Sequence, residues 1–233
     1  PYLISPRETE ILTNRPLKLR WNAVSGATNY TIKIDGVNWE TTTDKTTITY
    51  PGKPPLQEEI RYRVTIITNQ GVSSQDKSQK LVGFNVLDKQ NQATVLDAVK
   101  TIQQQSLSPE EKGLTLARLY RGYELYADAV EVLEQLVNQG SQNPVIYHLL
   151  GETYLEIKLP QFAKKIYKKA LKLTTNPDNL STQAALKAGL GESYFLLGNN
   201  KKALPLLKQA KADYTQLGDT LNVKRLDNII NKI

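Results

Sequence analysis

The chain has 233 residues, enough for one large or two ordinary domains, and its 39% hydrophobic and 23% charged residues suffice for a buried core. It has no Cys, which excludes disulfides and thiolate chemistry, and one His, which excludes a metal site built from several histidines. The net charge of +7 is divided evenly, with a surplus of three positive charges in residues 1–89 and four in residues 90–233. No basic tail is therefore present that would indicate a nucleic-acid partner.

No apolar run approaches the ~20 residues that span a bilayer, so we expect no integral membrane segment. The sequence contains no Met and starts at Pro1. We therefore expect it to be a fragment, with any targeting signal upstream.

Alternation of apolar and polar side chains predicts β-strands before residue 90. Tyr30, Ile32 and Ile34 alternate with polar neighbours, and this period of two recurs in short runs separated by Gly and Pro turns. The predicted strands are Tyr2–Ser5, Leu17–Asn22, Asn29–Asp35, Asn38–Thr42, Thr46–Tyr50, Arg61–Asn69 and Leu81–Leu87. Seven short strands separated by turns predict a β-sandwich of ~100 residues, which we place at residues 1–89.

Parts of this region resemble a fibronectin type III domain. Leu19–Trp21 and Gly26–Ile34 look like its second and third strands, and Leu56, six residues before Tyr62, is similar to its tyrosine corner. The resemblance implies that the Tyr62 hydroxyl ties the preceding loop to the sheet. The Pro and Gly usually found between that Leu and Tyr are replaced here by Gln57–Ile60.

After residue 90 the apolar period lengthens to that of amphipathic helices, and residues 91–105 form the first predicted helix. From Glu110 onward a pattern of small, aromatic, Ala and large residues recurs after 34 residues, the length of a helix-turn-helix repeat. The middle copy, residues 144–177, is the clearest. The next copy is displaced by 40 residues, which predicts an extra turn or loop around Asn176–Ser181.

The middle copy resembles the tetratricopeptide repeat (TPR). The residues that carry the resemblance are Tyr147, Leu150, Gly151, Tyr154, Ala163, Tyr167, Ala170 and Leu171. It extends over roughly residues 107–217 and implies three repeats between capping helices near 91–105 and 219–233. We therefore assign residues 90–233 to an α-helical TPR solenoid, which makes the chain a multidomain protein of β and α parts.

The small residues have a physical role in such a stack. Gly151 and Gly191 would remove a side chain where the two helices of a repeat cross, and Ala163 and Ala203 would do the same from the facing helix. Tyrosines at the eleventh position would fill the space between neighbouring repeats.

No complete catalytic set is present. His148 is the single histidine, and no Gly-x-Ser-x-Gly motif accompanies it. Acidic residues do not cluster with metal-ligand spacing, and no Gly-rich phosphate-binding loop occurs. We therefore predict no enzyme, no catalytic residue, no cofactor and no metal, and interpret His148 as a surface residue or a ligand contact.

Five lysines of one predicted helix share a face, because residues four apart align along a helix. They are Lys164, Lys165, Lys168, Lys169 and Lys172. We favour a solvated outer face over a surface for phosphate or acidic lipid head groups. Nucleic-acid binding through these lysines is the less favoured alternative, because no aromatic residues alternate with them to stack on bases.

In the TPR family the first helix of each repeat lines a concave surface, and its second, fifth, ninth, twelfth and thirteenth positions usually reach the ligand. The resemblance maps these positions onto Glu111, Arg118, Arg121, His148, Glu152, Glu156, Glu192 and Phe195. Leu114 and Arg118 stand where the chaperone-tail variety has the Lys and Asn of its carboxylate clamp, which argues against that clamp. Arginines early in the array and glutamates later predict a groove of mixed charge.

We therefore predict a non-enzymatic scaffold that binds a peptide or protein through the concave face, with the sandwich as spacer or second contact site. One alternative is a sensor or regulatory arm of a larger signalling or enzymatic polypeptide. Cysteine-free chains that join a sandwich to TPR repeats resemble exported bacterial envelope proteins. We therefore favour an exported or periplasmic location over the cytoplasm.

Overall fold

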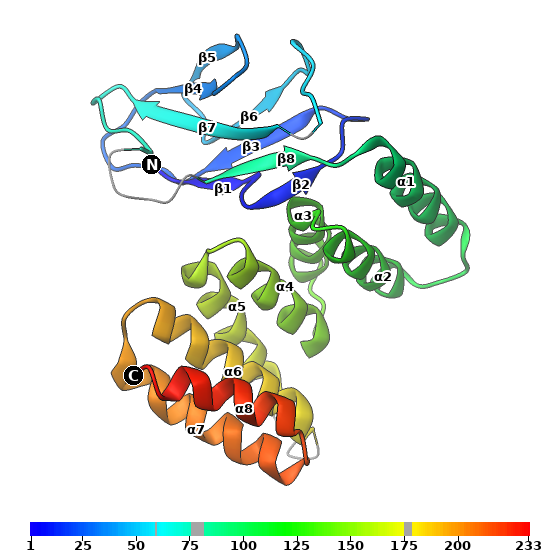
Figure 1. The fold of residues 1–233 in the computed structure, drawn as a ribbon, viewed down its shortest axis with the longest axis vertical. Coiled ribbons are helices and arrows are strands. Elements are labelled where there is room, and N and C mark those ends of the chain that lie inside the picture. The colour runs from blue at the N-terminus through cyan, green and yellow to red at the C-terminus, as the bar shows by residue number, and fades with distance from the viewer. Residues whose placement is uncertain (59, 76–81, 175–178) are drawn as a thin grey trace. The chain divides into compact units, whose positions relative to one another are not determined.

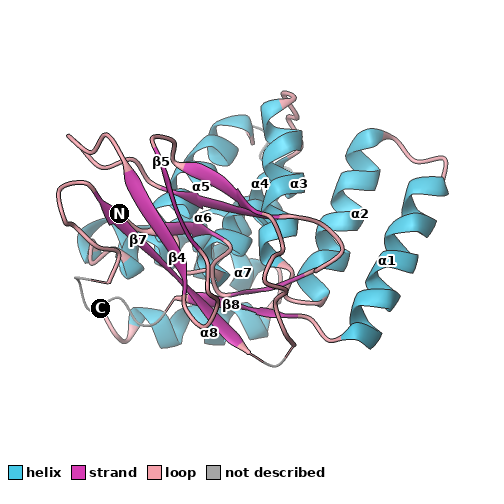
Figure 2. Cartoon of the chain, turned by 90° about the horizontal axis from the view of Figure 1, so that it is seen from above, coloured by secondary structure: helices cyan, strands magenta, loops and turns pink. Residues whose placement is uncertain are grey.

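The computed structural model describes residues 1–58, 60–75, 82–174 and 179–233. Over these residues the chain forms eight strands followed by eight helices (Figure 1), and Figure 2 shows the two kinds of element by colour. The chain divides into two compact units. The first contains Pro1–Ser106 and Thr115–Ala129, and the second contains Leu107–Leu114 and Val130–Ile233.

The strands of the first unit form two sheets. One sheet has the order β1 (Leu3–Ser5), β3 (Leu17–Trp21), β6 (Thr47–Tyr50). The other has the order β2 (Thr9–Ile11), β8 (Gly83–Val86), β7 (Arg61–Thr68), β4 (Tyr30–Ile34), β5 (Glu40–Thr43). Neighbouring strands are antiparallel except β2 and β8, which run parallel.

Each predicted strand has a counterpart among these eight, although residue 81 of the last one lies outside the described residues. The sequence analysis missed β2. Strand β2 is held by its parallel pairing with β8, in which Thr9 lies opposite Phe84, and no local pattern encodes that pairing.

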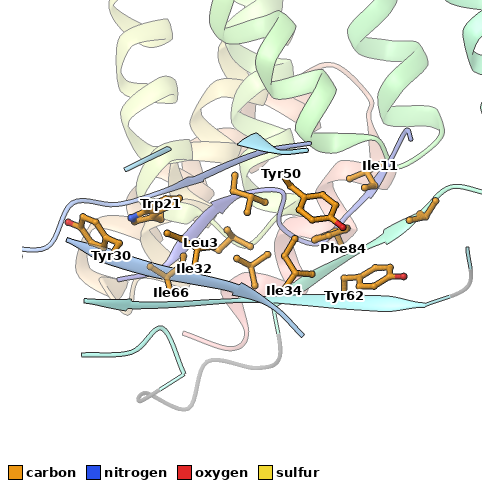
Figure 3. Close-up of a cluster of buried hydrophobic side chains, with 13 residues drawn as sticks. Leu3, Ile11, Trp21, Tyr30, Ile32, Ile34, Tyr50, Tyr62, Ile66 and Phe84 are labelled. Atoms are coloured by element: carbon orange, nitrogen blue, oxygen red, sulfur yellow. The ribbon is translucent and has the colours of Figure 1, made fainter. Parts of the chain in front are cut away.

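The two sheets share one hydrophobic core (Figure 3), built from the side chains that the period of two points inward. The side chains of Leu19, Ile32, Ile66 and Phe84 are fully buried, and the removal of their apolar surface from water stabilises the fold. The Trp21 ring lies edge-on to Tyr30, with ring centroids 5.6 Å apart. The core therefore draws on strands of both sheets.

The Tyr62 hydroxyl ties the preceding loop to the sheet, as the fibronectin resemblance implied. The backbone N–H of Gln57 donates a hydrogen bond to Tyr62 Oη at 2.7 Å, and the Tyr62 ring stacks on Phe84 with centroids 5.5 Å apart. Glu59, in the same loop, lies outside the described residues. The membership of these strands in the fibronectin type III family stays a prediction.

Helix α1 (Lys89–Gln104) and the residues around Glu124 belong to the same compact unit as the strands. The buried side chain of Gln92 accepts a hydrogen bond from the Thr13 backbone N–H at 3.1 Å and donates one to the Leu87 carbonyl. The Thr9 hydroxyl donates to the Glu124 carbonyl at 2.9 Å. This compact unit therefore extends past residue 89, and both the predicted domain boundary there and the predicted capping role of α1 stay predictions.

The remaining helices are α2 (Pro109–Gly122), α3 (Tyr126–Asn138), α4 (Pro144–Glu156), α5 (Pro160–Leu173), α6 (Leu180–Leu196), α7 (Asn200–Gln216) and α8 (Thr220–Ile230). Asn143, Asn199 and Asp219 are N-caps whose side chains accept backbone N–H bonds. Residues 176–178 of the loop predicted around Asn176–Ser181 lie outside the described residues, whereas Ser181 already belongs to α6.

The repeat period recurs in the backbone at the ends of α2, α4 and α6. Glu124, Lys158 and Gly198 each follow such a helix with a left-handed φ of 56°, 60° and 71°. The next N–H after each of them donates to the carbonyl of a tyrosine five residues earlier, at 2.8 to 2.9 Å. These turns are separated by 34 and 40 residues, the two offsets found in the sequence.

Candidate binding site

Two predicted glycines lie where helices of a repeat cross. A Cβ on Gly151 of α4 would lie 2.5 Å from Tyr167 Cζ of α5, and one on Gly191 of α6 would lie 2.8 Å from Leu207 of α7. Ala163 and Ala203, which face them in the prediction, are fully buried. The predicted close approach of the helices is therefore confirmed.

The sequence analysis missed Gly189, which also lies against the Tyr167 ring. A Cβ on Gly189 would lie 2.2 Å from Tyr167 Cζ. The buried Tyr167 ring therefore occupies space left by two glycines, Gly151 on α4 and Gly189 on α6. The available signal was the second small residue in the run Ala188–Gly191.

A cavity of about 340 Å³ opens beside this ring in the second unit. Tyr167 and Tyr214 contribute to its wall from α5 and α7. The other lining residues come from α4, α6 and α8: His148, Glu152, Leu155, Glu156, Ala185, Gly189, Glu192, Asn222 and Arg225. Helices α4 and α6 are the first helices of their repeats, and α8 occupies the equivalent place after α7.

The cavity is acidic. Three glutamates line it against one arginine, a net charge of minus two with His148 neutral. Arg225 Nη1 donates to Glu192 Oε2 at 2.8 Å, and His148 Nε2 lies 3.7 Å from Glu152 Oε1. The wall therefore already holds one cationic group against a carboxylate, a charge-assisted contact of the stronger kind.

Tyr214 supplies a neutral hydroxyl to the same wall. Burial raises the pKa of the Tyr214 phenol, Arg225 lowers it, and Asp219 and Glu152 raise it further. The net direction is upward, so the hydroxyl stays protonated at neutral pH and can donate a hydrogen bond.

Half of the predicted ligand-contact residues line this cavity. His148, Glu152, Glu156 and Glu192 meet there from two repeats, whereas Phe195 is not part of its lining.

Glu111 lies at the start of α2, where it forms a capping box. The Ser108 backbone N–H and hydroxyl donate to its carboxylate, and the Glu111 N–H donates back to Ser108 Oγ at 3.2 Å. These bonds lower the pKa of the Glu111 carboxyl, the Ser108 hydroxyl having the larger effect. Arg118 and Arg121 belong to the first unit and do not line the cavity. For these three residues a ligand contact stays a prediction.

The sequence analysis did not identify Asn222 and Arg225, because it treated residues 219–233 as a closing cap. The turn at Gly218, with a left-handed φ of 71°, ends α7, and Asp219 caps α8 by accepting from the Asn222 N–H at 3.0 Å. Helix α8 then follows α7 and brings Asn222 and Arg225 to the cavity.

Among the residues that the structure describes, no three His, Asp or Glu side chains group as a metal site requires. Within the same residues, no helix combines the length and apolar character needed to cross a membrane.

The profile of the tetratricopeptide repeat family matches residues 144–177. No curated protein gave a sequence match. Among solved structures, the chain is similar to PcrH in complex with the chaperone-binding region of PopB, with 16% identity, 54% of this chain and 98% of that chain covered, and a TM-score of 0.46. It is also similar to MamA, with 20% identity, coverages of 62% and 89%, and a TM-score of 0.43. The profile match, within which the helix pair α4–α5 lies, identifies residues 144–177 as a tetratricopeptide repeat.

Proposed function

We propose that the chain is a protein-interaction module whose acidic cavity takes a Lys or Arg side chain from a segment of a partner protein. The single observation that carries the proposal is the cavity itself, in which glutamates of two repeats converge on a wall that ends in Arg225. The sequence predicted a groove of mixed charge. The cavity that the structure describes between α4, α6 and α8 is acidic, which narrows the proposed partner to a basic segment.

The dimensions and chemistry of the cavity suit a long basic side chain. A volume of about 340 Å³ is at the lower end of ligand pockets, which favours one or two side chains over a whole folded surface. The aliphatic stem of a Lys or Arg would lie against Leu155 and the tyrosine rings, and its charged end would reach Glu152 or Glu156. Arg225 on Glu192 shows the same pairing from within the chain.

The strands are proposed to serve as a spacer or second contact site. Their two sheets, with three and five strands around one core, and the Tyr62–Gln57 hydrogen bond support the fibronectin-like assignment. A role as the regulatory arm of a longer polypeptide and an exported location stay proposals.

Selection of peptides from a random display library on the full chain tests the proposal. We expect Lys and Arg to be enriched among the selected peptides. The variant Glu152→Gln with Glu156→Gln should bind a selected peptide roughly tenfold more weakly, because one charge-assisted bond contributes about 1.5 kcal/mol.

Asp97→Asn with Glu131→Gln is the matched control, since both carboxylates are exposed and lie away from the cavity. The control should bind the peptide as the wild type does. Selection of peptides without basic residues, or equal binding by the two double variants, would contradict the proposal.

A further inference from the structure

Positive charge is concentrated on two helices of the second unit. Helix α5 contains five lysines and no acidic residue, and α7 contains four lysines and one acidic residue, Asp213. The two helices therefore have a net charge of +8, whereas the whole chain has +7. The two halves of the sequence have similar net charges, but the positive charge of the second half is concentrated on α5 and α7.

Eight of these nine lysines have no carboxylate within salt-bridge distance among the described residues. The exception is Lys211, which pairs with Asp227 of α8. We call the eight the lysine face: Lys164, Lys165, Lys168, Lys169, Lys172, Lys201, Lys202 and Lys208. Seven of them are exposed, and none lines the acidic cavity.

Lysines from both helices converge on one tyrosine of α6. The ammonium groups of Lys164, Lys168 and Lys202 lie 5.9, 5.7 and 5.7 Å from the centroid of the Tyr194 ring. A ring face attracts each cation, and the aliphatic stems cover apolar surface. The contacts place Lys164 and Lys168 of α5 beside Lys202 of α7, so that the charges of the two helices meet at Tyr194.

We infer that the lysine face docks on the surface of an anionic lipid bilayer. Juxtaposed lysines without acidic neighbours are attracted to anionic lipids as a group and need no precise geometry. The face lies across two helices and contains only Lys and no Arg. Tyr194 is 8% exposed and Tyr147 is fully buried, and the half-buried Phe162 ring has Lys165 over it at 5.9 Å. Bases therefore find little ring surface for stacking and no bidentate guanidinium, which favours lipid over nucleic acid.

Co-sedimentation of the full chain with lipid vesicles tests this inference. Vesicles of phosphatidylcholine with added phosphatidylglycerol should bind the chain, and vesicles of phosphatidylcholine alone should not. The variant Lys164→Gln, Lys168→Gln, Lys202→Gln should bind roughly 100-fold more weakly, about fivefold for each charge removed. Binding should also weaken as salt rises.

The matched control is Lys18→Gln, Lys45→Gln, Lys53→Gln, which removes the same charge at exposed positions of the strand unit. It should sediment with anionic vesicles as the wild type does. A second variant, Lys201→Gln with Lys208→Gln, replaces lysines that contact no ring among the described residues, so it should fold as the wild type does. It should weaken binding to anionic vesicles about 25-fold.

A binding measurement with duplex DNA in place of vesicles tests the alternative ligand. Binding to DNA without binding to anionic vesicles would overturn the inference in favour of nucleic acid. Equal loss of vesicle binding in the face variant and the strand-unit control would overturn it as well, since net charge alone would then decide. Because the cavity glutamates take no part, failure here leaves the peptide selections unaffected.

Discussion

Replacement of Gly189 by Ala is expected to lower the free energy of unfolding by about 2–3 kcal/mol. The added methyl group would lie 2.2 Å from Tyr167 Cζ, and a Cβ on Gly151 would lie 2.5 Å from the same atom. The buried ring therefore cannot keep its position, and moving it disrupts its packing against α4 and α6. At an ordinary helix position the same change would stabilise by about 1 kcal/mol, so the sign itself is diagnostic. Urea unfolding followed by far-UV circular dichroism measures the effect.

Gly122→Ala is the matched control, because nothing lies within 4 Å of the position where its Cβ would be. It should leave stability unchanged or slightly raised. Tyr167→Leu should make Gly189→Ala less costly, with a coupling of about 1 kcal/mol or more in a double-mutant cycle. A Gly189→Ala chain as stable as the wild type would show that the ring is not held between the two helices.

Trp21→Ala should lower the free energy of unfolding of the strand unit by about 3–5 kcal/mol. Trp21 is 2% exposed and belongs to the largest fully enclosed side chains of the core between the sheets. Both tryptophans of the chain lie in the strand unit, so the fluorescence of Trp39 reports its unfolding in the variant.

Trp21→Phe should lower the free energy of unfolding by less than about half as much as Trp21→Ala does. Within the described residues the buried Trp21 Nε1–H has no hydrogen-bond acceptor, so losing it removes an unsatisfied donor while most of the ring is kept. The edge contact with Tyr30 is retained by an aromatic ring. Equal destabilisation by Ala and Phe would contradict a packing role and point to the indole nitrogen.

Periodicity predicted the strands and helices because both reflect burial along one segment. Alternation located Tyr30–Ile34, and the 34-residue spacing located α4 and α5, since each pattern depends on neighbouring residues alone. The pairing of β2 with β8 and the hydrogen bond from Thr13 to Gln92 join residues 75 to 79 positions apart, and no local pattern encodes them.

Local sequence patterns also located only part of the candidate site. His148, Glu152, Glu156 and Glu192 follow from the register of the repeat. Residues of α8 could not be placed, because the helix after the last complete repeat carries no signature. The acidic character of the cavity and the basic lysine face emerge only when charges are assigned to helices.

Nuclear magnetic resonance of the single histidine tests the acidic cavity most directly. His148 lies in the cavity wall, and its ring signals are unambiguous because the chain has no other histidine. Titration with a selected Lys- or Arg-containing peptide should shift these signals in proportion to the fraction bound, and the same peptide with Glu in place of its basic residues should leave them unmoved. A peptide that binds the chain while the His148 signals stay unchanged would place its site elsewhere and contradict the proposed function.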